Sequence, residues 1–173
     1  MVGTEVKKKL SVEEFMELPD VCVELIDGQV VKEPMPTYGY QKISLSIATE
    51  IYIQLKQSHK GEIVVAPMDV FIGEHVVQPD LLFISTERLN IIKEGKIKAA
   101  PDVVFEVISP SNAFNDTKVK FDIYEQFGVK EYFIVYLDDK TVVKYVLSNG
   151  RFHEEYREIG LVKSEAIGCE VNF

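Results

Sequence analysis

The chain has 173 residues, of which 46% are hydrophobic and 27% are charged. This composition is close to the average for soluble globular domains and excludes a chain that is disordered throughout. The 19 basic and 28 acidic residues give a net charge of −9, which excludes a protein that attracts DNA through its overall field. No apolar run approaches the roughly 18–20 residues that span a bilayer, so we expect no membrane contact.

The cysteines and the N-terminal residues predict a cytoplasmic protein. Cys22 and Cys169 lie far apart in sequence and match no metal-ligand spacing, so we expect two reduced, buried thiols. The first ten residues contain charge but no apolar run of signal-peptide length. No linker or internal repeat divides the sequence, and we therefore expect one domain over residues 1–173, with residues 1–10 as a flexible tail.

The first elements predicted along the chain are a short helix, a hairpin and a long helix. Ser11 and Glu14 have the spacing of a capping box, which begins a short helix. The Asp27-Gly28 pair between two short apolar runs predicts a tight hairpin. A helix is expected over 40–56, where aliphatic residues recur at every fourth position: Ile43, Ile47, Ile51 and Leu55.

The remaining elements predict a mixed sheet. Strands are expected at residues 21–26, 29–31, 62–66, 69–72, 78–84, 103–108, 131–137, 141–147 and 151–156. A helix over 114–127, ended by Gly128, makes the two strands around it a parallel, right-handed pair. Asn149-Gly150 predicts a second hairpin, and residues 166–173 predict an edge strand. The predicted fold class is mixed α/β, with a central sheet flanked by helices and additional hairpins.

Three acids lie in or beside apolar strands, where an unpaired carboxylate is costly. Glu106 occupies the middle of the apolar run 103–108, in which side chains alternate between the two faces of the sheet. Asp80 follows Pro79 at the start of another apolar run, and Glu24 lies in the first hairpin. Each acid alone is also explained by an exposed edge or by backbone donors, whereas three in one small domain favour a shared site.

Lys120 is the expected positive partner of these acids. At about 100° per residue, it projects from helix 114–127 on the same face as the apolar residues that pack on the sheet, whereas Lys118 faces solvent. Two alternatives remain open: the stem of Lys120 covers the core while its ammonium reaches water, or Lys120 pairs with Asp116 four residues earlier. Carboxylates that bind Mg²⁺, together with a lysine that offsets charge or positions water, suit phosphodiester hydrolysis.

Four segments form an ordered set: Glu24-Leu25-Ile26-Asp27-Gly28; Val77-Gln78-Pro79-Asp80; Glu106-Val107-Ile108-Ser109-Pro110-Ser111 with Asp116, Lys120 and Tyr124; and Gly128-Val129-Lys130-Glu131-Tyr132. This set resembles the Uma family of restriction endonucleases, within the PD-(D/E)XK nuclease superfamily. The resemblance covers roughly residues 11–173. Ile108 occupies the usual position of the motif lysine, and in this family the lysine is placed on the following helix, in agreement with Lys120.

The resemblance implies a restriction-endonuclease-like fold and metal-dependent hydrolysis of DNA. It implies Asp80, Glu106 and Lys120 as catalytic residues, and Mg²⁺ or Mn²⁺ bound by Asp80 and Glu106 with Glu24 as a third ligand. Ser109, Asp116 and Tyr124 are implied as supporting residues. Two positions depart from the family pattern: Tyr40 stands where relatives commonly carry histidine, and Tyr136 where many carry aspartate. These departures concern contacts at the periphery of the substrate.

The partners expected from the sequence are DNA and a second copy of the chain. Because the net charge is −9, phosphate contacts have to come from local lysines, namely Lys93, Lys96, Lys98 and the run 7–9, which are equally explained as a solvated loop and tail. A homodimer is expected because two sites related by a two-fold axis cleave both strands, and the β-rich hairpins at 21–31 and 141–156 offer surfaces for it. The alternative function is a non-catalytic module for nucleic-acid or protein binding that retains the nuclease fold.

Overall fold

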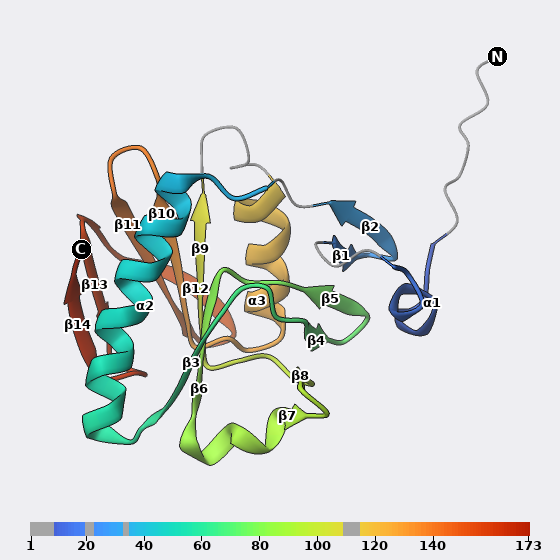
Figure 1. The fold of residues 1–173 in the computed structure, drawn as a ribbon, viewed down its shortest axis with the longest axis horizontal. Helices are drawn as coiled ribbons and strands as arrows, with labels where there is room; N and C mark the ends of the chain where they lie inside the picture. The colour runs from blue at the N-terminus through green and yellow to red at the C-terminus, as the bar shows by residue number, and fades with distance from the viewer. Residues whose placement is uncertain (1–8, 20–22, 33–34, 109–114) are drawn as a thin grey trace.

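The computed structural model describes residues 9–19, 23–32, 35–108 and 115–173, and the side chains of residues 115–117 lie outside this description. The chain adopts a mixed α/β fold with two six-stranded sheets, a separate two-stranded sheet and a small number of helices (Figure 1). The predicted fold class is confirmed.

The larger strands form one mixed sheet in the order β12-β11-β10-β9-β6-β3. Its members are β3 (Gly61–Val65), β6 (Leu81–Ser85), β9 (Val103–Ile108), β10 (Glu131–Tyr136), β11 (Thr141–Ser148) and β12 (Arg151–Ile159). Strands β9 and β10 run parallel, and all other neighbours in this sheet run antiparallel. The predicted parallel pair around a helix is therefore confirmed.

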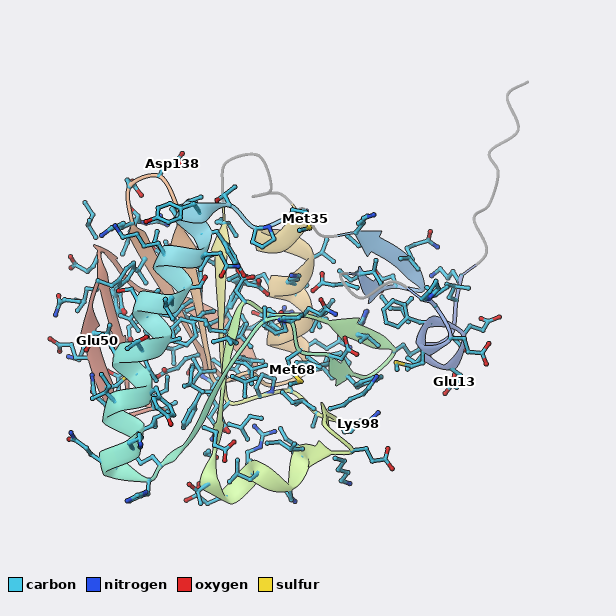
Figure 2. The ribbon with its side chains drawn as sticks, in the orientation of Figure 1. Glu13, Met35, Glu50, Met68, Lys98 and Asp138 are labelled. Atoms are coloured by element: carbon cyan, nitrogen blue, oxygen red, sulfur yellow. The ribbon has the colours of Figure 1, made fainter. Side chains whose placement is uncertain are left out.

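Helices cover both faces of this sheet (Figure 1). Helix α2 (Tyr38–Ser58) packs its aliphatic stripe on one face, against the stacked rings of Phe105 and Phe133, whose centroids are 4.5 Å apart. Glu50 of α2 is exposed to solvent, at the left of the helix in Figure 2. The crossover between β9 and β10 covers the second face, where Val104 and Ile108 are buried with residues of the crossover helix.

The crossover helix has two parts. It begins as a π-helix, η2 (Asn115–Lys120), and continues as α3 (Phe121–Gln126). Gly128 follows with φ of +82°, the left-handed conformation expected of a residue that ends a helix. The predicted helix 114–127 is thus confirmed within the described residues, although its first part is wound more loosely than an α-helix. Phe114 lies outside the described residues.

The second six-stranded sheet has the order β2-β1-β5-β4-β8-β7. Its strands are short: β1 (Val23–Ile26), β2 (Gln29–Lys32), β4 (Val70–Ile72), β5 (His75–Val77), β7 (Ile92–Lys93) and β8 (Lys96–Ile97). The hairpin turn between β1 and β2 has positive φ angles at Asp27 and Gly28, as a tight hairpin requires. Two further short helices are α1 (Val12–Met16), which has the predicted capping box, and the 3₁₀ helix η1 (Thr86–Ile91).

Two strand predictions differ from the structure. The expected strand 78–84 begins only at Leu81, as β6 (Leu81–Ser85), because residues 78–80 connect the end of β5 in one sheet to the start of β6 in the other. The expected edge strand 166–173 instead pairs as β14 (Cys169–Asn172) with β13 (Leu161–Ser164) in the separate two-stranded sheet. Cys169 is buried and unpaired, as predicted for this thiol, and Cys22 lies outside the described residues.

Candidate active site

Glu106 is held inside the protein by the crossover helix. It lies in β9, whose six residues are all buried, and its side chain shares the face of Val104 and Ile108 beneath α3. The hydroxyl of Tyr124 donates a hydrogen bond to Glu106 Oε1 at 2.7 Å. Burial and the neighbouring Glu106 charge raise the pKa of Tyr124 well above its ordinary value. Tyr124 therefore remains protonated and acts as a donor to Glu106.

Lys120 extends from the same crossover and lies between two acids. Its Nζ atom is 3.0 Å from Glu24 Oε1 and 3.4 Å from Glu106 Oε1. The side chain is only 3% exposed, whereas Lys118 is exposed to solvent. The predicted facing of these two lysines is confirmed, and the alternative in which the Lys120 ammonium reaches water is excluded. The side chain of Asp116 lies outside the described residues.

Glu24 is buried at the centre of the cluster and not at its periphery. Strand β1 is brought there by pairing with β5, in which Leu25 lies opposite Val76. The side chain of Glu24 is fully buried, and its Oε1 accepts a hydrogen bond from the Gln78 amide at 2.6 Å. Its other oxygen, Oε2, is buried without a hydrogen-bond partner among the described residues. A buried carboxylate oxygen without a donor is costly, so Glu24 Oε2 is an unsatisfied hydrogen-bond acceptor in the cluster.

Asp80 reaches the cluster from the neighbouring strand. In the antiparallel pairing of β6 and β9, Leu81 lies opposite Phe105, so Asp80 comes next to Glu106. The Val107 amide donates to Asp80 Oδ2 at 2.6 Å, and the hydroxyl of Tyr40 donates to Asp80 Oδ1 at 2.5 Å. Asp80 is partly exposed, whereas Glu24, Glu106 and Lys120 are buried. The structure therefore gives Asp80 the most accessible carboxylate of the group.

The structure thus unites most of the residues singled out from the sequence. Glu24, Glu106, Lys120 and Tyr124 form one contact network, with Asp80 directly before the adjacent strand β6. Ser109 lies outside the described residues. Sequence reasoning missed the contact of Tyr40 with Asp80. The helical stripe that buries Ile43 and Ile47 was a usable signal, because it also turns Tyr40 toward the sheet.

The donor atoms of this site suit a hard divalent cation in their chemistry. Carboxylate oxygens are the ligands that Mg²⁺ and Mn²⁺ prefer, and Glu24 Oε2 is a buried oxygen without a donor. Within the described part of the chain, however, no three Asp, Glu, His or Cys side chains are arranged to hold a metal ion together. In this arrangement the ammonium of Lys120 supplies the positive charge between Glu24 and Glu106.

One known family model matches most of the chain. The model of the Uma2 family, described as "Putative restriction endonuclease", matches residues 12–167. The chain belongs to the Uma2 family. The resemblance inferred from the sequence is therefore confirmed. The residues of the site cluster all fall within the part of the chain that the Uma2 model matches.

A solved structure shares this fold. It is the crystal structure of a protein described as a "putative nuclease belonging to DUF820" from Anabaena variabilis ATCC 29413, with a TM-score of 0.77 and 20% sequence identity. The match covers 92% of this chain and 91% of that chain. At this identity the likeness establishes the shared fold. No curated protein matches the chain. None of the helices in the described residues has the length and apolar character needed to cross a membrane.

Proposed function

We propose that this Uma2 family member is a metal-dependent DNA endonuclease in which Asp80, Glu106 and Lys120 are the catalytic residues. The observation that carries the proposal is the buried ammonium of Lys120 between Glu24 and Glu106, one strand away from the partly exposed Asp80. The cluster brings together the side-chain types that metal-dependent phosphodiester hydrolysis uses, namely carboxylates and a lysine. The family's description as an endonuclease supports the same reaction.

The acids are the proposed metal ligands. Asp80 and Glu106 would hold one or two Mg²⁺ or Mn²⁺ ions, and Glu24, with its unpartnered Oε2, would be the third ligand. When bound, such an ion polarises a phosphate oxygen and lowers the pKa of a water molecule. Tyr124 keeps the Glu106 carboxylate in a fixed orientation through its hydrogen bond.

Lys120 would act on the phosphate itself. Its ammonium, held beside Glu106, would offset negative charge that builds on a phosphoryl oxygen in the transition state. A fixed charge in a buried, water-poor position acts more strongly than the same charge in solvent. Ser109, which lies outside the described residues, and Asp116, whose backbone belongs to the π-helix η2, are proposed as supporting residues.

DNA binding would depend on local lysines, since the whole chain is acidic. Lys93 and Lys98 are exposed and are the proposed phosphate contacts of the β7–β8 region, together with residues 7–9. Lys96 is already paired with Asp69, with 3.3 Å between Nζ and Oδ2. We propose that Lys96 contributes less than its two neighbours.

The proposal further includes a single nuclease domain over residues 1–173, location in the cytoplasm and a homodimer. A two-fold dimer would bring two sites to the two strands of one duplex. Strand β12 is the terminal strand of its sheet, and the predicted hairpin 141–156 therefore offers an edge for self-association. Light scattering at micromolar concentration tests this: a mass of one chain would contradict it.

Cleavage of supercoiled plasmid in Mg²⁺ or Mn²⁺ tests the proposed activity. We expect nicked and linear DNA with the metal, none with a chelator present, and none from Glu106→Gln. The second candidate function is a binding module that keeps the fold without chemistry. The occupation of the space between two acids by Lys120 favours it. Binding of DNA at any metal concentration without cleavage would support that module and contradict the endonuclease.

A further inference from the structure

Tyr40 joins helix α2 to Asp80. Its hydroxyl donates to Asp80 Oδ1 at 2.5 Å, while the amide of Val107 in β9 donates to Asp80 Oδ2 at 2.6 Å. The two oxygens of this carboxylate are therefore held by donors from two different elements, a helix and a strand. Such a pair of donors restricts rotation of the Asp80 side chain about both of its bonds.

The register of α2 is what directs Tyr40 toward the sheet. The side chain of Thr37 caps the helix by accepting a hydrogen bond from the Tyr40 amide at 3.3 Å. The buried stripe that begins at Ile43 fixes the rotation of the helix, and the Tyr40 ring packs against the same core. Tyr38, two residues earlier, is 83% exposed. Two tyrosines in one helical turn thus have opposite environments.

The Tyr40 hydroxyl can hold Asp80 without excluding a cation, because it donates to only one of the two carboxylate oxygens. Each carboxylate oxygen has two lone pairs, so an oxygen that accepts from Tyr40 still has capacity for a cation.

We propose that Tyr40 is a positioning residue for Asp80: its hydroxyl holds the carboxylate in the orientation from which Asp80 binds the divalent cation. This inference rests on the proposed metal-dependent function. A hydrogen bond to a metal ligand pre-orients it, and loss of such a bond typically weakens metal binding by about 10–100-fold. Tyr40 itself would touch neither the metal nor the DNA.

The test compares Tyr40→Phe with Tyr38→Phe. Both remove one hydroxyl and keep the ring, but only the first removes a donor to Asp80. Mn²⁺ binding is measured by titration calorimetry, and plasmid cleavage is measured as a function of Mn²⁺ concentration. For Tyr40→Phe we expect a dissociation constant raised by about 10-fold, and a cleavage rate that returns close to that of the wild type at saturating Mn²⁺. Tyr38→Phe should match the wild type in both.

Each other outcome has a definite meaning. An unchanged Mn²⁺ dissociation constant in Tyr40→Phe would overturn the proposal, as would an equal loss in Tyr38→Phe. A cleavage rate that stays low at saturating Mn²⁺ would also overturn it, since positioning of a ligand is compensated by excess metal. If the wild type itself binds no Mn²⁺, the metal-dependent function fails and this role of Tyr40 fails with it. Circular dichroism at 10 °C in the absence of metal verifies that each variant is folded.

Discussion

Among the described residues, two clusters bury a lysine among carboxylates, and the two clusters differ in how completely the carboxylates are hydrogen-bonded. The first, the site cluster, consists of Glu24, Asp80, Glu106, Lys120 and Tyr124. The second, here called the C-terminal clamp, consists of Glu131, Lys144, Glu155, Ser164 and Glu165. In the clamp, Lys144 is fully buried, with Nζ 3.2 Å from Glu131 Oε1 and 2.7 Å from Glu155 Oε2, and it also pairs with Glu165. Burial alone therefore does not distinguish the two clusters.

The difference lies in how completely the central acid is bonded. In the clamp, Glu131 accepts from the amides of Glu165 and Ala166, both at 3.1 Å, and from the hydroxyl of Ser164. These bonds join β10 and β11 to the chain between β13 and β14. In the site cluster, Glu24 Oε2 has no donor among the described residues. A network with all its acceptors bonded ties elements together, whereas a buried carboxylate oxygen without a donor carries an uncompensated cost that a bound cation would relieve.

The strongest test of this comparison is Lys120→Ala beside Lys118→Ala. Cleavage by Lys120→Ala should fall by about 10²-fold or more, because the transition-state charge loses its partner. Lys118→Ala, which alters an exposed residue, should leave cleavage nearly unchanged. Equal losses in both variants, measured on one plasmid at one salt concentration, would point to a general charge effect.

Lys120→Ala should also lower stability. The whole Lys120 side chain is only 3% exposed. Its removal leaves Glu24 and Glu106 buried without a cation, which costs about 3–5 kcal/mol. Urea unfolding measures this loss, and Lys118→Ala should stay within about 0.5 kcal/mol of the wild type. Cleavage should therefore be compared at a temperature where both variants are folded.

Lys144→Met tests the clamp by the same measurements. Glu131 would lose its buried cation, so the free energy of unfolding should fall by about 3 kcal/mol. This is the lower limit expected for breaking a buried ion pair, because Glu155 and Glu165 are about half exposed. The cleavage rate of the folded variant should not change. A loss of cleavage without a loss of stability would assign the clamp to the chemistry and remove the distinction between the clusters.

Stabilisation by bound metal should distinguish Glu24, which has an oxygen without a donor, from the fully hydrogen-bonded Glu131. Mn²⁺ at about 100 times its dissociation constant should stabilise the wild type by about 2.7 kcal/mol. Glu24→Gln should reduce this gain, because one proposed ligand is neutralised, whereas Glu131→Gln should keep it. Thermal unfolding with and without Mn²⁺ measures both, and a reduced gain in Glu131→Gln alone would reverse the assignment.

The smallest expected effect concerns Asp102, a further buried acid that lies outside both clusters. Burial raises its pKa, but Lys130, the Ser85 amide and Arg88 outweigh this and hold the pKa of Asp102 below its ordinary value of 3.8. A lowered folded-state pKa means that this stability is present above pH 3.8 and is lost as the pH falls through the folded value. Asp102→Asn should cost about 1 kcal/mol at pH 7, because Lys130 is exposed and screened, and less in acid. An unchanged pH dependence of urea unfolding would contradict this.

Sequence alone determined the features that depend on local periodicity and turn chemistry. The apolar run of β9 with Glu106 at its centre, and the facing of Lys120, follow from the two-residue and 3.6-residue repeats. The hairpin at Asn149-Gly150 follows from residues that tolerate positive φ, here 52° and 75°. Membership of the Uma2 family was likewise readable from the ordered motifs.

The tertiary structure decided whatever depends on contacts between distant segments. The expected strand 78–84 starts late, at Leu81, because residues 78–80 form the connection between two different sheets. The burial of Glu24 depends on pairing between β1 and β5, and the bond from Tyr40 to Asp80 depends on how α2 lies on the sheet. The clamp around Lys144 likewise needs the C-terminal hairpin in place. Periodicity assigns a side chain to one face of its own element, but only packing decides which element that face meets.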